Sequence, residues 1–283
     1  MLTRTKTSWL GKAFFHHRFS LGGESRYTAT LFGKPENWSL SQLGHKDPVV
    51  REQFGARLGG VLYDLQVGNA FAPNPTKFTD RIIDASELTT HVAAGSATLR
   101  RNSERPADGV PLESGDAFVI STANCPVTLM ERSGAEALAL HTGRECLIDR
   151  ILVDTGRPTP GRSYHSICFS GLVRLGDPKS TKVKVFWAEP AHRSLYDLDD
   201  PTYGSFNRKL YKLIVDRWGI ACAPKKGNAF NIALPELIKA QCMEMGVPAT
   251  NIDLSHGHQP MKGTHLDGTP GKPRNLFVLA RRS

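Results

Sequence analysis

Two residues that can do chemistry, Cys125 and His141, stand at the ends of neighbouring predicted strands. Apolar β-forming runs precede and follow Cys125, and a turn at residues 131–134 leads to a third run that ends at His141, a pattern typical of a β-hairpin. Because a hairpin returns the chain to the level of its start, we expect His141 to lie beside Cys125. A thiolate next to an imidazole forms either half of a soft-ligand metal site or a nucleophile with its base.

The other histidines and cysteines give weaker signals. His165 and Cys168 have ligand-like spacing, but a single such pair is more typical of core packing. His256 and His258 are expected in a loop, without a third partner at fixed spacing. His91, taken alone, indicates only a surface or core histidine.

Composition indicates a globular protein with a sizeable core. The chain has 283 residues, of which 40% are hydrophobic. The basic N-terminal residues 1–12 are not followed by an apolar signal-peptide core, and no stretch approaches a membrane span. The five cysteines are odd in number and widely spaced, so we expect a reducing, cytoplasmic environment and no disulfide framework.

The charge balance favours anionic partners. The formal net charge is +9, with 36 Lys+Arg against 27 Asp+Glu. The basic residues are scattered and no basic motif with interleaved aromatic residues occurs, which argues against dedicated nucleic-acid binding. A nucleoside, a phosphate group or an acidic protein surface remains a suitable partner.

Predicted strands and helices alternate along the chain. Strands are expected at 13–21, 60–69, 167–173, 183–188 and 275–281, and helices at 49–58, 146–156, within 197–218 and within 230–246. This alternation predicts an α/β fold of mixed α+β type, in which mixed β-sheets pack against helices in a single domain over residues 1–283.

Five segments carry a resemblance to a known family. They are Ala13-Phe14-Phe15 through Gly22-Gly23-Glu24-Ser25, Thr122-Ala123-Asn124-Cys125, His141-Thr142-Gly143, Asn231 through Gly246-Val247-Pro248, and Asp267 through Lys272. In this order they resemble the motifs of the laccase-domain family, also called multicopper polyphenol oxidase-like proteins. That family includes purine nucleoside phosphorylases and a bacterial peptidoglycan-editing factor.

The resemblance implies a laccase-domain fold and a His-Cys-His site that binds zinc or acts in catalysis. Its second and third members correspond to Cys125 and His141, and position along the chain assigns the first to His91. It further implies a zinc-dependent purine nucleoside phosphorylase or adenosine deaminase, with a nucleoside and phosphate as ligands. A single His-Cys-His set does not supply the several copper sites of a laccase, so copper oxidase activity is the least favoured of the candidate functions.

The chain departs from the family pattern around the substrate. Arg144-Glu145 stands where the family has Trp-Arg, Asn124 replaces an Asp, and His265-Leu266 falls where arginines precede the closing turn. We expect Arg144, Arg274 and Asn124 to take over substrate binding.

Two alternatives remain open. Cytotoxic necrotizing factor toxins share the laccase-domain fold and use a Cys and a His to deamidate glutamine. In that mode Cys125 attacks a carboxamide and His141 moves the proton, and the substrate is a protein with an acidic surface. The other alternative is a degenerate family member that binds a ligand without catalysis.

Overall fold

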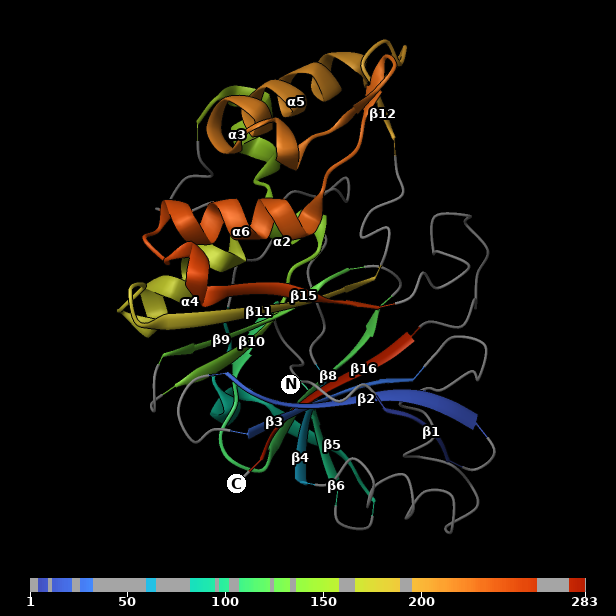
Figure 1. The fold of residues 1–283 in the computed structure, drawn as a ribbon, viewed down its shortest axis with the longest axis vertical. Helices are drawn as coiled ribbons and strands as arrows, with labels where there is room; N and C mark the ends of the chain where they lie inside the picture. Colours follow the sequence, from blue (N-terminus) through green and yellow to red (C-terminus); the bar gives the residue numbers. More distant parts are fainter. Residues whose placement is uncertain are drawn as a thin grey trace.

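Two stacked β-sheets and a layer of helices make up the fold (Figure 1). The computed structural model describes residues 5–9, 12–21, 26–32, 60–64, 82–94, 97–101, 107–122, 125–132, 136–157, 166–188, 195–258 and 275–282. The five-stranded sheet lies between the eight-stranded sheet and the helices (Figure 1). This arrangement confirms the mixed α+β fold class.

The eight-stranded sheet has the order β1-β2-β3-β16-β8-β4-β6-β5. Its strands are β1 (Thr5–Trp9), β2 (Lys12–Ser20), β3 (Arg26–Phe32), β4 (Gly60–Asp64), β5 (Thr89–Ala94), β6 (Ala97–Arg101), β8 (Asp116–Thr122) and β16 (Asn275–Arg282). The strand predicted at 275–281 is confirmed as β16, which pairs antiparallel with β3 on one side and β8 on the other. The sheet thus joins the two ends of the sequence.

The five-stranded sheet has the order β15-β11-β9-β10-β7. Its strands are β7 (Gly109–Pro111), β9 (Val127–Arg132), β10 (Ala137–His141), β11 (Thr181–Ala188) and β15 (Ile252–His258). Every residue of β10 is buried. Because this sheet is covered on both faces, β10 appears in the sequence as a continuous apolar run and not as an alternating one.

Five helices and a small sheet complete the described part. The helices are α2 (Arg144–Leu147), α3 (Arg150–Thr155), α4 (Ile167–Leu175), α5 (Gly204–Trp218) and α6 (Leu234–Glu244), with 3-10 turns at Ala85–Glu87, Ile220–Cys222 and Ala249–Asn251. The small sheet has strands β12 (Tyr196–Asp197), β13 (Lys225–Lys226) and β14 (Ala229–Phe230). No helix of the described residues is both long and apolar enough to cross a membrane.

Two hydrophobic cores hold the layers together. Between the sheets, the Phe186 ring lies 5.4 Å from that of Phe19 and 5.3 Å from that of Phe277, so residues of three strands meet in one aromatic cluster. On the other face, Met130 and Leu138 belong to the core that the helices cover. The five-stranded sheet that carries the hairpin is therefore fixed from both sides.

Three expectations about secondary structure are wrong. Residues 167–173, expected as a strand, form helix α4, which Ser166 caps by accepting a hydrogen bond from the Cys168 N–H at 3.1 Å. A short apolar run does not distinguish a buried helix from a buried strand by periodicity alone. The helix expected at 146–156 is two short helices, because Asp149 starts a new one by accepting from the Ile151 N–H at 2.9 Å.

The third correction concerns His256 and His258, which were expected in a loop. Both belong to strand β15, which pairs in parallel with β11. The side chains of His256 and His258 lie outside the part that the structure describes. The same holds for His165 and for the helix expected at 49–58.

Candidate functional site

The predicted hairpin of β9 and β10 brings the two halves of the site together. His141 pairs with Val127, two residues after Cys125. The loop after β10 is fixed to the segment before β9, because Thr142 donates its N–H to the Pro126 carbonyl at 3.0 Å and its hydroxyl lies 2.8 Å from that of Thr128. The Cys125 thiol hydrogen-bonds with the His141 side chain. The expectation that the hairpin places these two residues together is confirmed.

A buried carboxylate holds the imidazole from the other side. Nδ1 of His141 lies 2.8 Å from Oδ1 of Asp108, and the His141 N–H donates to the Asp108 carbonyl at 2.7 Å. Asp108 is fully buried, and it immediately precedes β7, which pairs with β10. Both the backbone and the ring of His141 are therefore fixed by one residue.

The electrostatics of His141 favour its protonated form. Burial lowers the pKa of the imidazole, but the electrostatic effect of Cys146 and the hydrogen bonds with Asp108 and Cys125 outweigh burial, so this pKa lies well above its ordinary value. The Cys146 sulfur lies 3.4 Å from Nδ1, and burial raises the pKa of its thiol well above the usual range. The ring thus lies between a buried carboxylate and two sulfur atoms.

Gly143 packs directly against the pair. A Cβ atom at this position would lie 3.0 Å from Nε2 of His141 and 3.1 Å from Sγ of Cys125. The backbone φ of Gly143 is −67°, which any residue can adopt. The absence of a side chain is thus needed for space and not for backbone conformation, and it leaves these two donor atoms side by side.

Two sides of His141 offer metal-ligand atoms. On the Nδ1 side, Asp108, His141 and Cys146 bring one ligand atom each to within 4.8 Å of one another, and all three are buried. On the Nε2 side, Cys125 is only half-buried. Because Nδ1 already contacts Asp108, a carboxylate that orients the ring is in place for a metal bound through Nε2. A thiolate and an imidazole also match the preference of zinc, so the residues present fit such an ion.

Arg144, expected to bind substrate, follows Gly143 at the start of α2. Its Nη2 donates to Oε1 of Glu145 and its Nη1 donates to the Tyr196 hydroxyl, both at 2.5 Å. Burial raises the pKa of the Glu145 carboxyl, but the nearby Arg144 charge outweighs it, so this pKa lies below its ordinary value. An ion pair therefore stands next to the reactive pair.

The remaining predicted site residues are not placed with the pair by the described structure. Asn124 and Arg274 lie outside the described residues, as does the side chain of His91. The backbone of His91 lies in β5, where the pairing with β6 shifts register between Thr90 and Val92. The assignment of His91 to the site stays a prediction.

Sequence reasoning missed Asp108 and Cys146. Asp108 precedes a glycine in a turn-rich segment and reads as an ordinary turn residue, because its contact with His141 spans 33 positions. Cys146 was interpreted only as an apolar residue of a helix. Its position five residues after His141 was the available signal.

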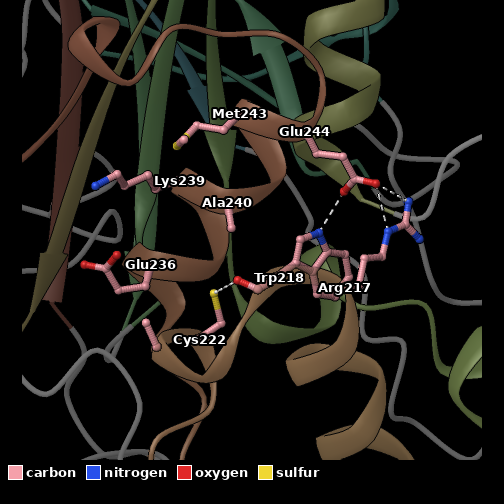
Figure 2. Close-up of a pocket in the computed structure, with 9 residues that line it drawn as sticks. Arg217, Trp218, Cys222, Glu236, Lys239, Ala240, Met243 and Glu244 are labelled. Atoms are coloured by element: carbon pink, nitrogen blue, oxygen red, sulfur yellow. Dashed lines mark hydrogen bonds and ion pairs between the residues drawn. The ribbon is translucent and has the colours of Figure 1, made fainter.

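A hollow of about 540 Å³ lies between the end of α5 and helix α6 (Figure 2). Figure 2 shows that Arg217 and Trp218 donate hydrogen bonds to the Glu244 carboxylate. Nε of Arg217 lies 2.9 Å from Oε1, and Nε1 of Trp218 lies 2.8 Å from Oε2. Cys222 lines this hollow, and burial raises the pKa of its thiol to about 11. The lining contains no histidine. This hollow does not offer the thiol and imidazole pair of the first site.

Comparison with known proteins gives a likeness of fold. No model of a known protein family matches the chain, and no curated protein sequence matches it. The structure is similar to that of the hypothetical protein YfiH from Bacillus licheniformis, with a TM-score of 0.54 and 14% sequence identity over 95% of this chain and 92% of that one. This similarity shows a shared fold.

Two further solved structures are more distant. YlmD from Geobacillus stearothermophilus has a TM-score of 0.48 and 13% identity over 97% of this chain and 93% of that one. Neisseria meningitidis protein NMB0706, of the family model DUF152, has a TM-score of 0.46 and 13% identity over 99% of each chain.

Proposed function

We propose that the protein is a zinc-dependent enzyme of laccase-domain type that acts on purine nucleosides at Cys125 and His141. The observation that carries this proposal is the 2.8 Å contact between Asp108 and Nδ1 of His141. A carboxylate that holds one ring nitrogen leaves the other to serve the reaction centre beside a thiol. The fold shared with YfiH and the order of the sequence motifs support the assignment to a divergent laccase-domain protein.

In this proposal Cys125, His141 and His91 are the zinc ligands. A bound zinc ion supplies a Lewis acid and brings the pKa of a water ligand toward neutrality. Asp108 keeps the His141 ring in one orientation, and the missing side chain of Gly143 leaves room for both donor atoms. The reaction is either removal of the purine amino group or cleavage of the bond between base and ribose by phosphate.

The test is incubation of the purified protein with adenosine, inosine and methylthioadenosine, with and without phosphate, followed by identification of the products. We expect conversion of at least one nucleoside, and its loss in Cys125→Ala and His141→Gln. Cys222→Ala is the matched control, because Cys222 lines the hollow between α5 and α6 and not the Cys125–His141 pair. Nucleosides that survive intact would contradict the proposal.

A cysteine hydrolase is the second candidate, and the contacts of His141 favour it. The Cys125 sulfur neighbours an imidazole that a carboxylate holds, and a Cys with a His is the catalytic pair of protein glutamine deamidases. In this mode Asp108 orients the imidazole as the third member of a catalytic triad. Ammonia release from a glutamine-containing protein by metal-free enzyme, together with rapid alkylation of Cys125, would favour this candidate over the zinc enzyme.

A further inference from the structure

The arginine next to the reactive pair is occupied by groups of its own chain. Arg144 forms an ion pair with Glu145 at 2.5 Å and a hydrogen bond with the Tyr196 hydroxyl, and its guanidinium carbon lies 5.7 Å from the centre of the Tyr196 ring. The side chains of Arg144 and Glu145 are only 21% and 22% exposed. Solvent therefore screens this pair less than a surface pair, and the arginine charge is balanced within the protein.

We propose that Glu145 determines the specificity of this site for water over phosphate as the attacking group. The inference rests on the proposed function, and it selects between the two reactions named there. Glu145 acts through Arg144: it binds the guanidinium that would otherwise face an anion, and it places a carboxylate near His141.

The balance of charge beside Cys125 explains this selectivity. A phosphate dianion needs a positive environment and charge-assisted hydrogen bonds from groups that the protein does not already use. Here the positive Arg144 is matched by Glu145. Incoming phosphate would meet the Glu145 carboxylate and would have to displace it from Arg144. Water carries no charge and meets no such barrier.

The hydrolytic reaction balances without another reactant. The oxygen of water forms a bond to the purine carbon that carries the amino group, and the bond from that carbon to nitrogen breaks. One proton of the water leaves with the amino group as ammonia, and the other ends on the oxo ring product as its lactam N–H. In phosphorolysis, by contrast, a phosphate oxygen would bond to the ribose carbon while the bond from ribose to base breaks.

Binding of inorganic phosphate tests the inference without relying on turnover. We expect isothermal titration calorimetry to show that Glu145→Gln binds inorganic phosphate on the order of tenfold more tightly than the wild type. The matched control is Glu236→Gln, because Glu236 is an exposed acid in the first turn of α6 and its loss changes the net charge equally. It should bind phosphate as the wild type does.

A double variant, Arg144→Gln with Glu145→Gln, locates the effect. We expect it to lose the gain in phosphate binding, because the released guanidinium is absent. Wild-type protein that binds phosphate as tightly as Glu145→Gln would overturn the inference, and so would a double variant that keeps the gain.

Turnover provides an independent measurement. Wild-type conversion of a nucleoside should proceed at the same rate with and without phosphate, and conversion that requires phosphate would overturn the inference. If no nucleoside is converted, the proposed function fails, while the calorimetric comparison still decides whether Glu145 excludes phosphate.

Discussion

Replacing Asp108 by Asn removes the charge that holds His141 and keeps the shape of the side chain. The wild-type contact joins a fully buried carboxylate to Nδ1 at 2.8 Å. Hydrogen bonds to charged groups contribute about 1.5–3 kcal/mol. Because the Asn oxygen can still accept a hydrogen bond, we expect a loss of about 2 kcal/mol in the free energy of unfolding. Loss of a carboxylate that orients a functional histidine should also lower activity about 10- to 100-fold.

The effect on stability should depend on pH in a defined direction. The folded-state pKa of His141 lies above its unfolded value, so the stability that it contributes is fully present below the unfolded pKa and is lost as pH rises through the folded pKa. In metal-free protein, the difference between wild type and Asp108→Asn should therefore be largest near pH 6 and should shrink at alkaline pH.

Two measurements on metal-free protein check this prediction: urea unfolding across this pH range and an NMR titration of the His141 ring. The titration should show a lower His141 pKa in Asp108→Asn. Asp149→Asn is a suitable control, since Asp149 is buried and caps α3 but has no contact with His141 among those described. An unchanged His141 titration in Asp108→Asn would refute the reasoning.

Three further predictions concern Gly143, the cysteines and Asp116. Gly143→Ala should lower nucleoside conversion, measured as the initial rate, at least about tenfold, because its Cβ would lie 3.1 Å from the Cys125 sulfur. Unchanged activity would contradict this prediction. At pH 8, mass spectrometry should find Cys125 alkylated before Cys222, whose pKa is about 11, and the reverse order would contradict the exposure of the site. Burial raises the pKa of Asp116, so its contribution to stability is present below about pH 4 and is lost as pH rises through the folded pKa. In urea unfolding, the free energy of unfolding of Asp116→Asn should therefore rise relative to that of the wild type from pH 4 to 7. Parallel pH profiles of the two proteins would disprove this.

The part of the site that depends on local pattern could be predicted from the sequence. The hairpin around the turn at 131–134 has strong β-forming runs, and pairing of β9 with β10 then fixes His141 next to the segment that carries Cys125. The resemblance to the laccase-domain family pointed to the same pair. Neither inference needs distant contacts.

The part that depends on distant contacts could not be predicted. Asp108 reaches His141 only because β7 adds to the edge of β10, and a three-residue strand leaves almost no periodic signal. The partners of Arg144 show the same limit, since Tyr196 lies 52 positions away in a two-residue strand. Helix α4 was mistaken for a strand because its contact with the sheet makes most of its residues apolar.

Zinc content tests most directly which side of His141 forms the reaction centre. The account predicts about one zinc per chain in the wild-type protein, its loss in Cys125→Ser and its retention in Cys146→Ser, because Cys125 lies on the Nε2 side and Cys146 lies on the Nδ1 side with Asp108. Zinc that is lost with Cys146 and kept without Cys125, or a wild-type protein that takes up no zinc, would contradict it.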